Sequence, residues 1–194
     1  MADELKRRLV HASGSGLVAL WLLANALEVP LTWGRFRLLM IVLALGTIVL
    51  EFLRLRVGLE LWLYDKLTRE YEQKQFAGYG YYMISMTLVV LVFGPDVALP
   101  AMLMLSLGDP ISGAVSSDSL ERIKPPRVLV TMFVVSTLIA SLFLPLAAAL
   151  AAALGATIAD GITHRVGEYI VDDNLTIPIY ASVLAWAVLA FGSV

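Results

Sequence analysis

Acidic side chains interrupt the apolar parts of this sequence at three places. Asp109 stands between a glycine and a proline, Asp160 lies near the end of a long uncharged stretch, and Asp172, Asp173 and Asn174 precede the last apolar run. A carboxylate inside an apolar segment is costly and by default suggests a functional site. Carboxylate and amide oxygens are hard ligands that suit Mg²⁺ carried on a nucleotide phosphate. We therefore expect a cation or phosphate site, although the Asp-Asp-Asn run taken alone also fits a helix N-cap.

Basic residues accompany these acids. Arg7, Arg8 and His11 enter the first apolar run, and Lys124 precedes a Pro-Pro pair that presents it at the membrane interface, where a phosphate can meet it. Basic residues at such positions also anchor to anionic lipid, and both interpretations stay open. His11 lies a turn inside the apolar helix beside small residues, which allow close approach of another helix or a ligand.

The segment 54–78 mixes charged, apolar and aromatic residues. This pattern is typical of an amphipathic helix that lies on a membrane surface and needs no chemistry of its own. Arg69 and Glu70 contribute to a site only if they point into the helix bundle.

The composition excludes a water-soluble domain. Of the 194 residues, 59% are hydrophobic and 15% are charged, against roughly 45–50% and 25% in soluble domains. Each membrane-spanning helix needs about 20 residues, so we expect one integral membrane domain over 1–194. A net charge of -2 gives no reason to expect nucleic acid as a partner, and the absence of Cys excludes disulfides, thiolate metal sites and cysteine nucleophiles. No small-residue cleavage site follows the first apolar run, so we expect it to be a span and not a removable signal peptide.

The spacing of the charged residues predicts an all-α, polytopic membrane bundle of about seven transmembrane helices with a cytoplasmic N-terminus. This threading puts twelve of the fourteen basic residues on one side, as the positive-inside rule requires. The candidate chemistry falls on the same side, so we expect a multi-pass protein of the cell membrane whose site faces the cytoplasm. The expected spans are 9–31, 38–53, 79–94, 97–117, 128–144, 146–163 and 175–192, and the expected cytoplasmic loops are 54–78, 118–127 and 164–174.

Four motifs follow one another along the chain, separated by hydrophobic spans. They are Glu4-Leu5-x-Arg7-Arg8-x-x-His11-x-x-Gly14, Arg69-Glu70, Gly108-Asp109-Pro110 and Asp172-Asp173-Asn174-Leu175-Thr176-Ile177-Pro178. In this order they resemble the polyprenol kinase family, which includes dolichol kinase, phytol kinase and the CTP-dependent diacylglycerol kinase. The resemblance covers essentially the whole chain, and the last motif is the most specific. After the Gly-Asp-Pro element the family usually carries further glycines, a Lys-Ser and a Glu-Gly-Ser, where this chain has a different sequence over 116–126. The lack of Cys and the compact loops suit a prokaryotic member.

The resemblance implies transfer of the γ-phosphoryl group of CTP to a lipid alcohol from the bilayer, a dolichol-like polyprenol or a related isoprenoid or glycerolipid alcohol. Such transfer needs metal and cationic groups at the phosphates and a base or positioning group at the hydroxyl. The implied catalytic residues are Asp109, Asp173 and His11; those for nucleotide and phosphate binding are Arg7, Arg8, Lys124, Asn174, Arg69 and Glu70; those for Mg²⁺ are Asp172, Asp173, Asp109 and Asp160.

Two other functions stay open. One is a CTP-dependent cytidylyltransferase that acts on a lipid phosphate, and the other is a small ion-coupled transporter with Asp109 and Asp160 as an intramembrane relay. The crowding of polar clusters on one face disfavours transport. The sequence leaves open which lipid is used and whether the chain forms a homo-oligomer.

Overall fold

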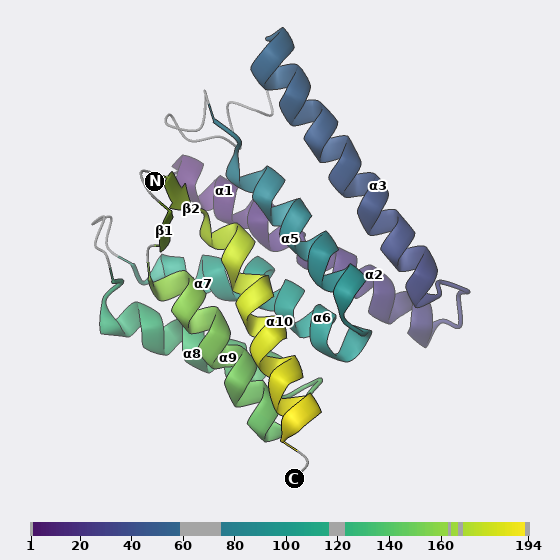
Figure 1. Ribbon diagram of the computed structural model, residues 1–194, viewed down its shortest axis with the longest axis vertical. Helices are drawn as coiled ribbons and strands as arrows, with labels where there is room; N and C mark the ends of the chain where they lie inside the picture. Colours follow the sequence, from purple (N-terminus) through teal and green to yellow (C-terminus); the bar gives the residue numbers. More distant parts are fainter. Residues whose placement is uncertain (1, 59–74, 117–122, 163, 167–168, 193–194) are drawn as a thin grey trace.

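Helices make up nearly all of the described chain (Figure 1). The structure is a computed structural model that describes residues 2–58, 75–116, 123–162, 164–166 and 169–192, without the side chains of 2–7 and 164–170. The helices are α1 (Ala2–Ser13), α2 (Ser15–Ala26), α3 (Trp33–Phe52), α5 (Gly78–Val92), α6 (Pro95–Leu103), α7 (Asp109–Ala114), α8 (Pro126–Ala140), α9 (Leu146–Gly161) and α10 (Asp173–Phe191). Two wider π-helical turns, η1 (Leu53–Val57) and η3 (Met104–Gly108), extend α3 and join α6 to α7.

Seven helical segments of the described chain are apolar. Four are long and apolar enough to cross a membrane: Arg8–Ala26, Trp33–Val57, Pro95–Ala114 and Asp173–Phe191. Three more are apolar but shorter: Gly78–Val92, Pro126–Ala140 and Leu146–Gly161. The structure thus confirms a mainly helical chain with several candidate membrane spans. The side of the membrane on which the N-terminus lies stays a prediction.

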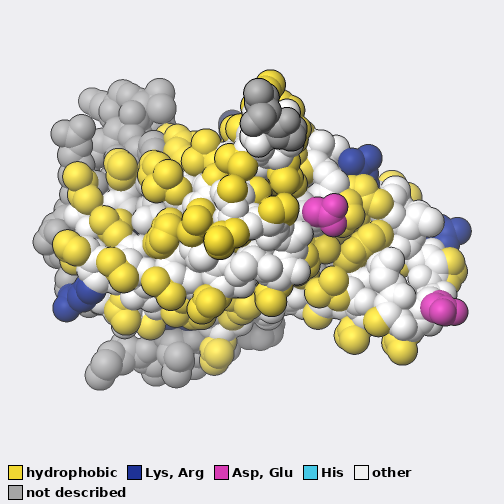
Figure 2. Space-filling view, turned by 90° about the horizontal axis from the view of Figure 1, so that it is seen from below, with side chains coloured by type: hydrophobic (Ala, Val, Ile, Leu, Met, Phe, Trp, Pro, Cys, Tyr) yellow, Lys and Arg dark blue, Asp and Glu magenta, His cyan; other side chains and the backbone are white. Residues whose placement is uncertain are grey.

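The outer surface of the bundle is also apolar. On α3, the side chains of Leu38, Val42, Leu45 and Val49 recur at three- and four-residue spacing, and each is more than half exposed. Figure 2 shows a face of the molecule on which hydrophobic side chains predominate and few charged ones interrupt them. A largely apolar face of this kind suits contact with lipid.

One connection departs from the all-α prediction. Within the expected loop 164–174, strand β1 (His164–Val166) pairs antiparallel with strand β2 (Tyr169–Val171), with Arg165 opposite Ile170. The pairing gives hydrogen-bond partners to the backbone groups of the residues that connect α9 to α10. Apart from this short hairpin the described chain is helical, so the prediction of an all-α fold class is confirmed.

The segment formed by α6, η3 and α7 lies at the centre of the bundle. Every residue from Val97 to Met102 is buried, and α6 contacts α2, α5, α8 and α10. Around it, α3 packs on α5, α10 contacts both α5 and α9, and α8 packs on α9. The central segment therefore brings Asp109, at its far end, among the ends of the surrounding helices.

Small side chains let α9 and α10 pack closely. Six alanines of α9 are buried, and Ala181 and Ala185 of α10 are buried as well. A Cβ on Gly155 would lie 2.5 Å from the backbone oxygen of Tyr180, so only glycine fits at this contact. Such stripes of small residues allow helix backbones to approach each other without a hydrophobic driving force from water.

We expect Gly155→Ala to reduce stability by about 1–3 kcal/mol, because the new methyl group must push α9 away from the backbone of α10. Gly46→Ala is the matched control, since a Cβ there meets no atom within 4 Å and alanine favours helix over glycine by about 1 kcal/mol. Thermal unfolding in detergent micelles measures both. An unchanged midpoint for Gly155→Ala would contradict the close packing described here.

Candidate functional site

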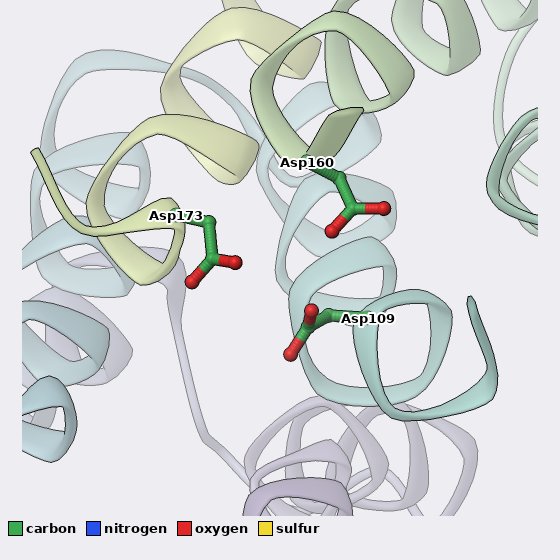
Figure 3. A group of neighbouring side chains, drawn as sticks. All are labelled: Asp109, Asp160 and Asp173. Atoms are coloured by element: carbon green, nitrogen blue, oxygen red, sulfur yellow. The ribbon is translucent and has the colours of Figure 1, made fainter. Parts of the chain in front are cut away.

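Three aspartates from three helices meet at one end of the bundle. Asp109 begins α7, Asp160 is the next-to-last residue of α9, and Asp173 begins α10. One carboxylate oxygen of each lies within 4.8 Å of the others, and Figure 3 shows the three carboxylates turned toward a common space. We call Asp109, Asp160 and Asp173 the aspartate cluster.

A π-helical turn positions Asp109. The N–H of Asp109 bonds to the carbonyl oxygen of Met104, five residues back instead of the four of an α-helix. Pro110 follows, and in a regular α-helix its ring would clash with the carbonyl four residues earlier and leave that carbonyl without a donor. The wider turn accommodates the proline, so the Gly-Asp-Pro motif marks a local change of helix geometry.

Asp160 is the buried member of the cluster. Its side chain is fully buried, and Lys124 Nζ donates to Oδ1 at 2.6 Å. Ser112, one turn after Asp109 on α7, donates from its hydroxyl to Oδ2 at 3.1 Å. Both oxygens thus have a partner, as a carboxylate removed from solvent requires.

Lys124 is held beside the cluster by its backbone. Its N–H donates to the carbonyl oxygen of Gly161 at 2.9 Å, and Ile123 forms an antiparallel bridge with Ile162. From there the ammonium group also lies 3.5 Å from Oδ2 of Asp173. Burial acts to lower the pKa of Lys124, but attraction by Asp173 and Asp160 outweighs it and raises the pKa above its usual value. The side chain is therefore an ammonium cation at neutral pH.

The side chain of Asp172 forms a helix cap, one of the two interpretations that the sequence left open. Its side chain caps α10, because Oδ1 accepts from the backbone N–H of Asn174 at 2.9 Å and from its side-chain amide at 2.6 Å. The cluster of carboxylates that can share one ion includes Asp173 and not Asp172. Of the two interpretations of the Asp-Asp-Asn run, the helix cap thus describes Asp172 and the acidic cluster describes Asp173. The amide oxygen of Asn174 is buried and has no hydrogen-bond partner within the described part of the chain.

His11 joins the cluster from α1. Its Nδ1 lies 3.1 Å from Oδ2 of Asp109, and its ring packs on that of Tyr82 with centroids 4.5 Å apart. The Tyr82 hydroxyl donates to the carbonyl oxygen of His11 at 2.9 Å and occupies the place where a Cβ of Gly14 would be. The second ring nitrogen, Nε2, is buried and finds no partner among the described residues. The neutral ring can therefore donate from Nδ1 to Asp109 and still accept a hydrogen bond at Nε2.

Of the remaining predicted residues, Arg8 has a described side chain and the others lie outside the described residues or side chains. The guanidinium group of Arg8 donates to the carbonyl oxygen of Gly113 at 3.0 Å and so ties α1 to α7. Arg7 belongs to α1, but its side chain is outside the description, as are Arg69, Glu70 and most of the predicted surface helix in 54–78.

Two contributors were missed by sequence reasoning. Ser112 follows Asp109 by three residues. That spacing places both residues on one face of a helix and could have indicated that Ser112 lies near the site. Tyr82 stands in an aromatic run with no distinguishing pattern, so its contact with His11 required the folded structure.

The cluster fits a divalent cation by its chemistry and spacing. Mg²⁺ binds oxygen ligands at about 2.1 Å in octahedral geometry, so two ligand oxygens lie at most about 4.2 Å apart, and the three carboxylate oxygens, now within 4.8 Å of one another, would move closer together to bind one ion. Two carboxylates 4.8 Å apart repel each other by roughly 3 kcal/mol at an effective dielectric of about 20. One ammonium group offsets this repulsion only in part, so the donor set leaves negative charge for a bound cation.

Comparisons with protein-family models, with curated proteins and with solved structures give no match for this chain. A functional assignment therefore depends on the chemistry of the site. Three carboxylates, an ammonium group and a histidine at the ends of apolar helices can bind a metal-complexed phosphate and orient a hydroxyl group.

A second buried carboxylate lies outside the aspartate cluster. Glu51 of α3 is 1% exposed and accepts two bonds of 2.8 Å from Arg54, one of 3.1 Å from the backbone N–H of Ala77, and one from the hydroxyl of Tyr79. Arg54 also donates to the carbonyl oxygen of Gln75 at 2.7 Å. These bonds join the end of α3 to the start of α5, and because both carboxylate oxygens are satisfied we assign Glu51 a structural role.

We expect Glu51→Ala to destabilise the fold by about 3 kcal/mol or more, because it breaks a buried ion pair with Arg54 and removes the carboxylate that accepts from Ala77 and Tyr79. Such a loss lowers the unfolding midpoint by about 5 °C or more. Glu28→Ala removes an exposed carboxylate and is the control. Equal midpoints for the two variants in micelles would show that the Glu51 pair contributes little.

Proposed function

We propose that this protein is a CTP-dependent lipid alcohol kinase that transfers the γ-phosphoryl group to the hydroxyl of a dolichol-like polyprenol or a related lipid alcohol. The single observation that carries the proposal is the aspartate cluster with Lys124 and His11, built where apolar helices end. Phosphoryl transfer depends mainly on positioning and on neutralising charge, and this set of groups is suited to both.

The donor side of the proposed site is formed by the acids and Lys124. Asp109, Asp160 and Asp173 are the proposed ligands of Mg²⁺, which when bound neutralises charge on the β- and γ-phosphates. Lys124 is close enough to Asp160 and Asp173 to contact the same phosphates with its ammonium group. Asp173 begins a helix of 19 residues, and the positive end of a helix dipole favours bound phosphate.

The acceptor side is assigned to His11. Nδ1 of the ring contacts Asp109, and Nε2, which has no partner among the described residues, would accept a hydrogen bond from the hydroxyl of the lipid alcohol. In the proposed step the acceptor oxygen bonds to the γ-phosphorus while the bond from that phosphorus to the β–γ bridging oxygen breaks, and CDP leaves with the electron pair. The hydroxyl proton passes to Nε2 of His11 and from there to solvent.

The position of the site supports a lipid acceptor. Asp160 stands at the end of α9 and Asp173 at the start of α10, so the cluster lies at the ends of apolar helices, where a membrane-bound hydroxyl and a soluble nucleotide can meet. We propose that this end faces the cytoplasm, the compartment that supplies CTP. The choice of a polyprenol and of CTP rests on the resemblance of the motifs to the polyprenol kinase family.

The placement of Asp160 and Asp173 at helix ends argues against transport. An ion-coupled carrier needs acids near the middle of the membrane that are reached alternately from both sides. The cytidylyltransferase alternative uses the same groups on the α-phosphate, and the label that reaches the lipid distinguishes it from the kinase.

We expect purified protein with Mg²⁺ and a panel of lipid alcohols to move label from γ-labelled CTP into lipid, and none from α-labelled CTP. Asp173→Asn should reduce the rate by at least about a hundredfold, because loss of even an outer-shell partner of a metal ligand costs roughly 10–100-fold. Asp96→Asn is the control, because Asp96 is exposed and lies at the start of α6, at the opposite end of the central segment from Asp109. Label from the α position would assign a cytidylyltransferase, and no label from intact protein would exclude both enzymes.

We expect His11→Gln to lower kcat roughly a hundredfold or more, the usual effect of removing a general base, with little change in the KM for CTP. The reason is that the proposed role of His11, through Nε2, is with the hydroxyl of the acceptor and not with the nucleotide. Ser13→Ala changes an exposed residue of the same helix and should leave both constants unchanged. A large rise in the KM for CTP with unchanged kcat would place His11 on the donor side instead.

A further inference from the structure

Lys124 occupies the space between two carboxylates that are also candidate metal ligands. Its Nζ lies 2.6 Å from Oδ1 of Asp160 and 3.5 Å from Oδ2 of Asp173. The third acid, Asp109, is contacted by His11 instead. The ammonium group of Lys124 is thus a cation that two carboxylates of the cluster already hold. The same carboxylates are therefore able to bind a positive charge.

We propose that Lys124 is a tethered counter-ion that competes with a divalent cation for Asp160 and Asp173. The inference rests on the metal site of the proposed function and adds how that site is controlled. In the metal-free protein the ammonium group neutralises the two acids, and metal enters as the ammonium group leaves them. Metal binding and movement of Lys124 are therefore linked.

The local structure allows the ammonium group to move while the backbone stays in place. The Lys124 N–H is bonded to Gly161, and the Ile123–Ile162 bridge fixes the chain immediately before it. The side chain itself is 30% exposed and has a flexible four-carbon stem. Asp160, in contrast, is fully buried and bonded to Ser112 as well as to Lys124, so the acid stays when the ammonium group departs.

Displacement of Lys124 frees it for the phosphates. A metal–nucleotide complex brings its own negative charge, and an ammonium group leaving Asp160 finds a new anionic partner there. Metal without nucleotide offers no such partner. The tethered lysine thus disfavours metal in the absence of nucleotide and favours the two arriving together, which is a positive coupling between two ligands.

Mn²⁺ binding to purified protein in detergent micelles, measured by electron paramagnetic resonance without any nucleotide, tests the proposal. Lys124→Met removes the ammonium group at similar side-chain length and should bind Mn²⁺ at least about tenfold more tightly than the natural chain, because the competing charge is gone. Lys124→Arg keeps a cation and should bind as weakly as the natural chain. Arg127→Met removes an exposed basic side chain three residues away and should change the affinity less than twofold.

A double variant shows where the gained Mn²⁺ binds. Adding Asp160→Asn to Lys124→Met should abolish the gain, since the freed site includes that carboxylate. Size-exclusion chromatography checks folding, and Lys124→Gln replaces Lys124→Met if the latter aggregates. Affinity for Mn²⁺ that is unchanged or weaker without Lys124, or a gain that persists after Asp160→Asn, overturns the proposal.

The outcome of the Mn²⁺ binding test does not depend on whether the proposed kinase activity is found. Tighter Mn²⁺ binding by Lys124→Met together with no transfer of label from CTP to lipid would leave the tethered counter-ion standing and remove the kinase. Transfer of label from CTP to lipid together with unchanged Mn²⁺ affinity of Lys124→Met would support the kinase and overturn the tethered counter-ion.

Discussion

Carboxylates brought together at the ends of apolar helices repel one another, and the rest of the site is arranged around that repulsion. Within the aspartate cluster the oxygens lie within 4.8 Å, and Asp160 has no exposure to water that would screen its charge. The described structure offsets this repulsion with Lys124, whose pKa is raised by the acids it contacts, with a hydrogen bond from Ser112 to Asp160, and with the close contact of His11 Nδ1 to Asp109. A divalent cation bound there would complete the neutralisation.

Close helix packing makes the cluster geometrically attainable. Gly155 and the buried alanines bring α9 against α10, so that Asp160 and Asp173 face each other across the hairpin connection. The π-helical turn before Pro110 brings Asp109 to the same end of the bundle. Each of these two features satisfies a local requirement of packing or backbone geometry, and together they bring the three aspartates close to one another.

The two buried acidic centres of the described chain differ in how far their atoms are satisfied. Glu51 accepts bonds from Arg54, Ala77 and Tyr79 at both oxygens, which leaves nothing for a ligand to complete. Around the aspartate cluster, His11 Nε2 and Asn174 Oδ1 are buried without partners among the described residues. Buried polar atoms without partners are costly, and a ligand bound at the aspartate cluster would supply the partners that these two atoms lack.

The sequence by itself predicted apolar helices long enough to cross a membrane, because the apolar composition and the spacing of charges favour such helices, and the structure has four of them. It also identified Asp109, Asp160, Asp173, Lys124 and His11 as candidates, since ionisable residues within or beside apolar segments are costly and rarely incidental. Only the tertiary structure decided that Asp173 joins the cluster while Asp172 caps a helix, that Tyr82 supports His11, and that a hairpin links α9 to α10. Those outcomes depend on which side chains meet across helices, and a one-dimensional pattern encodes spacing along a helix but not distances between helices.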